Sequence, residues 1–184
     1  MSEDVFNRQS RFRKGYDIEQ VNKFFEFSRT AYEGSVPAEK FSAAQIRCMA
    51  FDMVRGGYVT KEVDAALDRL ELAFVKRDRA NEIAKNGQES WNKAVADRAT
   101  TLYPRMLRPH GERFAHPRKG KGYSSSEVDA FIDRLIDFFD HGAPLTAHDV
   151  RKATFRAERG NKAYEENVVD TYLARAVEIL LAVE

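Results

Sequence analysis

The sequence has few of the residues that cross-link a fold or break it into loops. Its 184 residues include one cysteine, Cys48, which excludes an internal disulfide and a cysteine-based zinc site. The 10 glycines and 5 prolines make up about 8% of the chain, below the roughly 12% of average usage. This excludes a collagen-like or low-complexity chain, and the length suits one domain or two small ones with a buried core.

The net charge does not indicate binding to nucleic acid, and no apolar run is long enough to indicate a membrane-spanning helix. The 30 Lys and Arg residues nearly balance 29 Asp and Glu residues, so an anionic partner would have to meet a local patch. The longest apolar run, residues 179–183, is far shorter than the ~20 residues of a membrane-spanning helix. The start, MSEDVFNRQS, is polar and acidic and has no signal-peptide core. We therefore expect a cytoplasmic protein.

What the chain does contain is one pattern repeated four times. The segments are FRKGYDIEQVNKFFE, MVRGGYVTKEVDAALDRLE, RKGKGYSSSEVDAFIDRLI and ERGNKAYEENVVDTYLARAV. In each, a Tyr follows a basic stretch, a Val stands five residues later, and Asn or Asp comes next. The Tyr and Val pairs are Tyr16 with Val21, Tyr58 with Val63, Tyr123 with Val128, and Tyr164 with Val169. Such regular internal similarity indicates a repeat protein, here a duplicated duplication.

The spacing of the repeats predicts how the chain is divided. Residues 1–80 hold the first pair of repeats, residues 110–184 hold the second pair, and residues 81–109 form a helical connector. Within each pair, a Pro and a short helical lead-in separate the two members. The lead-ins are residues 42–51 and residues 146–155.

Apolar residues after each Tyr recur at helical spacing, and no segment shows period-two alternation with turn signals. We therefore predict an all-α protein of four helix-turn-helix units in tandem. A long central helix or helical hairpin is expected from Lys61 to about Arg98, a stretch without Pro in which Gly87 is the single glycine. Trp91 is interpreted as packing between the halves.

The Tyr-to-Val spacing predicts how the helices begin. With Asp17 or Ser124 as the N-cap, the Tyr falls at N′ and the Val at N4, the two positions of a hydrophobic staple. Gln20 and Glu127 then fall at N3, and we expect them to complete capping boxes. The repeated Tyr and Val are therefore structural residues that fix how the chain enters each helix.

The arrangement FRKGYDIEQVNKFF, with GGYVTKEVDAALDRL and GKGYSSSEVDAFIDRL, resembles the DivIVA domain. This domain is the N-terminal module of bacterial cell-division and polar-growth scaffold proteins, and the repeated copies resemble those of actinobacterial members. The resemblance implies paired helical units, a non-enzymatic adaptor role, and association with itself or with other DivIVA-like proteins. It also implies a peripheral location on the inner face of the cell membrane, at poles or septum.

In that family an exposed apolar residue followed by Arg, just before the Gly-Tyr turn, contacts the membrane. The best match is Phe12, followed by Arg13 and Lys14, and Val54 followed by Arg55 is a weaker match. The other two repeats keep only bases there, namely Arg118, Lys119 and Arg159. Phe12 is therefore either a membrane-touching tip or a residue folded under the N-terminal arm.

Charge is segregated along the second half of the chain. Residues 105–123 carry a net charge of +5 and residues 151–162 carry +4, whereas residues 124–140 carry −4. Basic turns can bind anionic lipid, at about 1 kcal/mol per base near such a surface, or nucleic-acid phosphate, or they pair with neighbouring acids. A nucleic-acid-binding module that uses these turns is thus the alternative function.

No residue pattern indicates catalysis. The carboxylate pairs Asp64 with Asp68 and Asp129 with Asp133 each span one helical turn, and we interpret them as first-turn acids favoured by the helix dipole. The four histidines lack the short helical spacing of a metal pair. Cys48 is expected in the core. The sequence therefore predicts a protein that is not an enzyme, with no cofactor, no metal and no small-molecule substrate.

Overall fold

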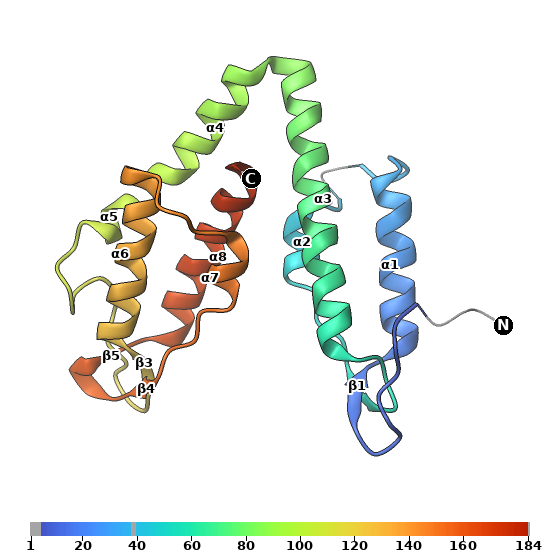
Figure 1. The fold of residues 1–184 in the computed structure, drawn as a ribbon, viewed down its shortest axis with the longest axis horizontal. Helices are drawn as coiled ribbons and strands as arrows, with labels where there is room; N and C mark the ends of the chain where they lie inside the picture. The colour runs from blue at the N-terminus through green and yellow to red at the C-terminus, as the bar shows by residue number, and fades with distance from the viewer. Residues whose placement is uncertain (1–4, 38–39, 184) are drawn as a thin grey trace. The chain divides into compact units, whose positions relative to one another are not determined.

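The structure is a computed structural model that describes residues 5–37 and 40–183, and it divides into two compact units between Asn81 and Glu82. We call these unit 1 and unit 2. The chain is mostly helical, and each unit carries short strands at one end (Figure 1). Residues 82–109, most of the predicted connector, belong to unit 2.

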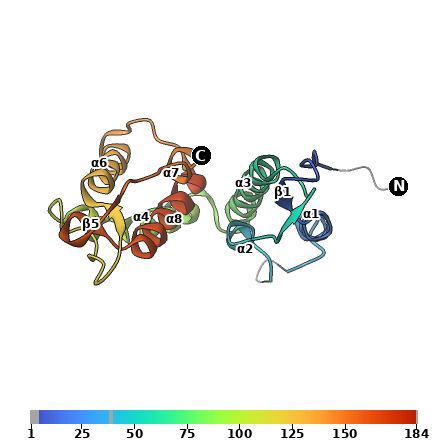
Figure 2. The ribbon, with the colours of Figure 1, turned by 90° about the horizontal axis from the view of Figure 1, so that it is seen from below.

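Unit 1 combines helices with a small antiparallel sheet. Its elements in chain order are β1 (Lys14–Tyr16), α1 (Ile18–Tyr32), α2 (Ala43–Arg47), β2 (Met53–Arg55) and α3 (Thr60–Asn86), of which residues 82–86 belong to unit 2. β1 pairs with β2, and Gly15 lies opposite Val54. Seen end-on, α1, α2 and α3 surround a common interior (Figure 2).

The core of unit 1 is rich in aromatic side chains. Two clusters of buried residues join α1 to α3, one near the sheet and one toward the other end. The clusters are Val21, Phe51, Tyr58 and Val63, and then Ala31, Phe41, Ala43, Ile46 and Phe74. Arg77 of α3 donates to the carbonyl oxygens of Ala31 at 2.8 Å and Tyr32 at 3.1 Å. These bonds satisfy carbonyls that the last turn of α1 leaves without helical partners.

Unit 2 carries a three-stranded sheet. Its elements are α4 (Gln88–Thr100), α5 (Tyr103–Met106), β3 (Gly122–Ser124), α6 (Ser125–His141), α7 (Ala147–Arg151), β4 (Ala157–Glu158), a 3₁₀ turn (Gly160–Lys162), β5 (Ala163–Tyr164) and α8 (Glu166–Val183). β3 is the central strand and pairs antiparallel with β4 and β5. α8 packs against α4 and α7 and supplies much of the buried apolar surface of unit 2.

The predicted central helix is interrupted. Gly87 separates α3 from α4, and its φ of +85° is a left-handed conformation that favours glycine and ends helical hydrogen bonding. Trp91 on α4 is only 7% exposed, and its indole N–H donates to the carbonyl oxygen of Ala182 at 3.3 Å. The interpretation of Trp91 as packing between the halves is therefore corrected, because it packs inside unit 2 against α8.

The prediction of an all-α protein was wrong about the segments around each Tyr. The chain is predominantly helical, but β1 to β5 are real pairings of three residues or fewer. Strands this short cannot display period-two alternation. They form because a distant segment supplies the hydrogen-bonding partner. Such a partner leaves no periodic pattern in the sequence of the strand.

The start of α1 is as predicted, but the capping box is not. Asp17 accepts a hydrogen bond from the N–H of Gln20 at 2.9 Å, so that Tyr16 lies at N′ and Val21 at N4. The Gln20 side chain does not return to the cap. It donates to Asp52 Oδ2 at 2.7 Å and accepts from the N–H of Asp52 at 2.9 Å.

The same correction applies to α6. The Ser124 side chain caps no N–H, and Glu127 accepts from the backbone N–H of Arg156 at 2.7 Å and from its guanidinium. Capping boxes form instead at the lead-in helices α2 and α7, between Ser42 and Gln45 and between Thr146 and Asp149. The N3 side chains of α1 and α6 thus fasten each helix to the segment that follows the lead-in.

Candidate functional site

Each unit brings its two Tyr-containing segments together, backbone against backbone. In unit 1 the N–H of Tyr16 donates to the carbonyl of Tyr58 at 3.0 Å, and the N–H of Tyr58 donates to the carbonyl of Tyr16 at 2.8 Å. In unit 2, Tyr123 lies opposite Tyr164 in the register of β3 and β5. The repeated segments therefore meet in pairs within one unit.

Glycine stands beside these tyrosines because the backbones nearly touch. A Cβ on Gly15 would lie 2.7 Å from the carbonyl oxygen of Gly57 and would overlap that of Tyr58. A Cβ on Gly122 would likewise overlap the carbonyl oxygen of Tyr164. Close approach is thus the physical reason for the Gly-Tyr sequence at both places.

The tyrosine hydroxyls cross to the opposite segment of each pair. Each bonds the Asn or Asp that follows the Val of the other segment, so Tyr58 bonds Asn22, Tyr164 bonds Asp129, Tyr16 bonds Asp64 and Tyr123 bonds Asp170. The hydroxyl of Tyr58 lies 3.1 Å from Asn22 Oδ1, and that of Tyr164 lies 3.0 Å from Asp129 Oδ1. All four repeat valines, Val21, Val63, Val128 and Val169, are buried. The sequence analysis assigned Asp64 and Asp129 to the helix dipole and missed their tyrosine partners.

These surroundings hold the proton on the hydroxyls of Tyr16, Tyr123 and Tyr164. Burial, followed by the bond to Asp64, raises the pKa of Tyr16, and burial with Asp170 raises the pKa of Tyr123. Burial raises the pKa of Tyr164 to about 12. The charge of Asp129 adds to that rise in pKa, while the bond from the N–H of Arg113 opposes it.

This raised pKa predicts a loss of stability in alkali. Unfolding would return Tyr164 to a pKa near 10, so its contribution is complete below about pH 10 and is lost as the pH rises through about 12. We expect the difference in unfolding free energy between the wild type and Tyr164→Phe to shrink between about pH 10 and about pH 12. Urea unfolding followed by the fluorescence of Trp91 measures it for unit 2, since Trp91 is the only tryptophan. A difference that does not change with pH would contradict the prediction.

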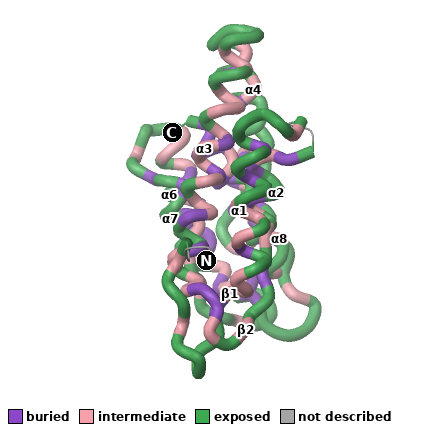
Figure 3. Tube along the Cα trace, turned by 90° about the vertical axis from the view of Figure 1, so that its right-hand side faces the viewer, coloured by how far each residue is buried: buried purple, intermediate pink, exposed green. Residues whose placement is uncertain are grey.

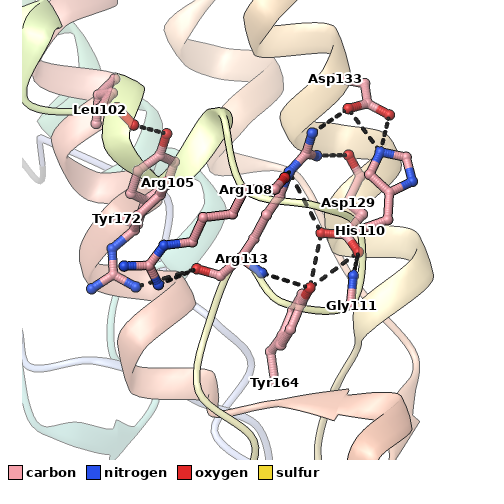
Figure 4. A network of polar contacts seen from close by, with 10 residues as sticks. All are labelled: Leu102, Arg105, Arg108, His110, Gly111, Arg113, Asp129, Asp133, Tyr164 and Tyr172. Atoms are coloured by element: carbon pink, nitrogen blue, oxygen red, sulfur yellow. Dashed lines mark hydrogen bonds and ion pairs between the residues drawn. The ribbon is translucent and has the colours of Figure 1, made fainter.

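Asp129 is also part of a buried polar network (Figure 4). The side chains of Arg113 and Asp129 are 4% and 3% exposed, and Arg113 Nε lies 3.8 Å from Asp129 Oδ1. The Arg113 guanidinium donates at 2.7 Å to the carbonyl of Asp129 and at 2.7 Å to Asp133 Oδ1. The N–H of Gly111 donates to Asp129 Oδ2 at 2.7 Å. The network therefore fastens the loop between α5 and β3 to α6.

Asp133 lies at the exposed edge of this network. Burial would raise the pKa of Asp133, but hydrogen bonds from Arg113 and His110 outweigh it and lower the pKa below its ordinary value. The pair Asp129 and Asp133 thus has a structural role around one arginine. In unit 1, Asp64 bonds Tyr16, and burial raises the pKa of Asp64.

The unit 1 tip, residues 8–14 and 53–56, contains the residues best suited to bind an anionic partner. It contains Arg8, Arg11, Arg13, Lys14 and Arg55 and no acidic residue. The β1–β2 register places Lys14 opposite Arg55. The turns beyond the strands are exposed (Figure 3). The structure therefore brings the Phe12–Lys14 segment next to Arg55.

Two apolar side chains are exposed on the unit 1 tip. Phe12 is 79% exposed, with the guanidinium of Arg11 at 4.8 Å from its ring centroid. Met53 is 47% exposed, whereas Val54, the residue that the sequence singled out, is half-buried opposite Gly15. Alternation along a strand explains the exchange, because neighbouring side chains point to opposite faces.

The unit 2 tip, residues 117–121 and 158–162, is basic but not apolar. Five cations and one acid lie on it: Arg118, Lys119, Lys121, Arg159, Lys162 and Glu158. The register of Gly122 with Glu158 brings its two loops side by side. No large apolar residue of this tip is exposed among the residues that the structure describes. Its contact with an anionic surface would be purely electrostatic.

An open groove of about 690 Å³ on unit 2 has an aromatic floor of Phe131 and Phe155. Its acids already have partners. Hydrogen bonds from Arg156 lower the pKa of Glu127, and hydrogen bonds from Thr146 lower the pKa of Asp149. A carboxyl group held charged in this way is a poor general acid near neutral pH.

Cys48 ends α2 and is exposed, so the expectation of a buried cysteine was wrong. Over residues 5–37 and 40–183, no group of three or more His, Cys, Asp and Glu side chains is placed to hold a metal ion. Within the same ranges no helix combines the length and apolar character needed to cross a bilayer. No family model, no curated protein and no solved structure matches this chain.

Proposed function

We propose that this chain is a non-enzymatic adaptor of bacterial cell division or polar growth that attaches to anionic membrane through the unit 1 tip. The observation that carries the proposal is the exposure of Phe12 and Met53 on a tip whose two segments, residues 8–14 and 53–56, contain five cations and no acidic residue. The adaptor associates with itself or with other DivIVA-like proteins. It lies peripherally on the inner face of the membrane, at a pole or septum.

The four-repeat organisation belongs to the same proposal. We infer that each unit is an internal pseudo-dimer of two DivIVA-like repeats. Support comes from the reciprocal contacts, since Tyr16 and Tyr58 exchange backbone hydrogen bonds and each hydroxyl also bonds the fifth residue of the other segment's helix. Reciprocal contacts of this kind are typical of a twofold interface.

The expected strength of attachment is modest. Burying one large apolar side chain contributes about 1.5–3 kcal/mol, and each base near an anionic surface adds about 1 kcal/mol. Five bases and Phe12 together resemble the marginal, reversible binding of a single acyl chain. Attachment should therefore depend on both the anionic lipid and the apolar side chain.

Liposome sedimentation tests this attachment. We expect the protein to pellet with vesicles that contain phosphatidylglycerol and to remain in solution with phosphatidylcholine alone. The double variant Phe12→Ala with Arg13→Ala should lose roughly tenfold or more in vesicle affinity, since it removes an apolar contact and a charge from one tip. A wild-type protein that does not pellet with anionic vesicles at low salt would refute the membrane part of the proposal.

Unit 2 offers a matched control pair. Leu107 is 80% exposed, against 79% for Phe12, and Arg98 is also exposed. Leu107→Ala with Arg98→Ala removes the same chemistry away from the unit 1 tip and should leave pelleting unchanged. Equal loss in both double variants would show that general charge, and not the tip, drives binding. Binding of duplex DNA with a steep salt dependence, without pelleting, would favour the nucleic-acid alternative.

A further inference from the structure

A second hollow in unit 2 has a chemistry that the adaptor role does not use. This pocket, of about 370 Å³, lies where the end of α4 and the start of α5 face the N-terminal half of α8. Its polar and aromatic lining consists of Thr101, Arg105, Asn167, Thr171, Tyr172 and Arg175. A leucine and a valine complete the lining, which contains two arginines and no acid.

The positive charge of the pocket is only partly compensated. The Arg105 guanidinium lies 5.3 Å from the ring centroid of Phe114 and donates to the carbonyl of Arg113 at 3.5 Å, and it forms no ion pair with any carboxylate in the described ranges. Arg175 lies 3.7 Å from Glu178 and keeps 48% of its side chain exposed. Arg105 is therefore placed by neutral groups, and its charge is available to a ligand.

Helix α8 supplies both polar and apolar lining residues, and Arg105 comes from α5. Asn167, Thr171 and Arg175 are spaced four residues apart, which places them along one face of α8. The Thr171 hydroxyl already donates to the carbonyl of Asn167 at 2.7 Å, so the available donors are the Asn167 amide and the two guanidinium groups. The Tyr172 hydroxyl donates to the carbonyl of Leu102 at 3.1 Å, as Figure 4 shows, and its buried ring faces the cavity.

We propose that this pocket binds a small organic oxyanion, a carboxylate or a phosphate monoester with a compact apolar body. Guanidinium groups pair with such oxyanions through two parallel hydrogen bonds. The tyrosine ring, the leucine and the valine suit the apolar body, and the volume lies at the lower end of the roughly 300–1,000 Å³ of known ligand pockets.

Isothermal titration calorimetry at low salt tests the pocket with phenyl phosphate and benzoate, and with phenol as the uncharged control. We expect saturable binding of at least one of the two anions and none of phenol. Arg105→Gln and Arg175→Gln should each weaken binding at least about tenfold, the typical effect of losing one charged hydrogen bond. Arg98→Gln, on α4 but outside the pocket, should leave the affinity within about twofold, as usual for a surface change. No saturable binding of either anion by the wild type, or equal loss in Arg98→Gln, would overturn the proposal.

Folding and specificity are controlled in the same series. Because Arg105 contacts Phe114, the binding result for Arg105→Gln is used only if the unfolding midpoint of this variant, measured by Trp91 fluorescence, matches that of the wild type. If it does not match, the binding result for Arg175→Gln, a change at a half-exposed site, tests the proposal. Arg175→Lys keeps the charge but loses the planar fork, and it should bind with intermediate affinity. Arg175→Gln should pellet with anionic vesicles like the wild type, which separates this pocket from the unit 1 tip.

Discussion

Replacing Gly122 by alanine should lower the unfolding free energy of unit 2 by about 3 kcal/mol or more, the upper range for overpacking. The added Cβ would lie 2.9 Å from the carbonyl carbon of Tyr164 and closer still to its oxygen. Both neighbours are backbone atoms that β3 and β5 hold in register, so they cannot move without breaking the sheet. Urea unfolding read by Trp91 fluorescence measures the loss.

Gly120 provides the control for this experiment. It stands in the same loop with φ of +87°, and nothing lies within 4 Å of a Cβ built there. Gly120→Asn should cost less than about 1 kcal/mol, because asparagine tolerates left-handed backbone. A similar loss in both variants would mean that backbone conformation, and not the close approach to Tyr164, explains the glycine at 122.

Replacing Arg113 by methionine should cost unit 2 about 3–5 kcal/mol, the usual effect of leaving a buried charge without its partner. Asp129 would remain buried beside Asp133 without the guanidinium that lies between them. The loop that carries Arg113 would also lose its hold on α6. Arg118→Met, at an exposed position of the unit 2 tip, should change stability by no more than about 0.5 kcal/mol.

Unit 1 shows how this loss can be partly repaired. Asn22 occupies the place after Val21 that Asp129 occupies after Val128, and it accepts from Tyr58 at 3.1 Å. The double variant Arg113→Met with Asp129→Asn should therefore recover at least about 1 kcal/mol over Arg113→Met alone. If the second change adds to the loss, the charge of Asp129 is not what Arg113 compensates, and the account of this network is wrong.

The helix starts were predictable from sequence for a local reason. The staple between Tyr16 and Val21 and the cap at Asp17 involve residues within five positions of one another, so their spacing in the chain is their spacing in space. The burial of the repeat valines was predictable for the same reason, because helical periodicity places them on one face. The exposure of Phe12 was one of two alternatives that the sequence left open.

The partners of the N3 side chains were not predictable in this way. Gln20 bonds Asp52, 32 residues away, and Glu127 bonds Arg156, 29 residues away. Both side chains could also have bonded the backbone of their own N-cap in a capping box. In the structure they bond the distant residues instead. The sequence also did not predict that Met53 is exposed and Val54 is half-buried. This difference depends on β2, a strand that forms only because it pairs with β1.

The start of a helix two residues after each of the four tyrosines, the helical content and the cluster of bases before Tyr16 follow from the amino-acid sequence alone, since each depends on near neighbours. Folding in three dimensions brings the tyrosines together in pairs, sends their hydroxyls across to the opposite helix, and buries Arg113 between Asp129 and Asp133. These contacts join residues that lie far apart along the chain. A hydrogen bond across dozens of residues leaves no period in the sequence, and it forms only after the packed helices have brought its two groups together.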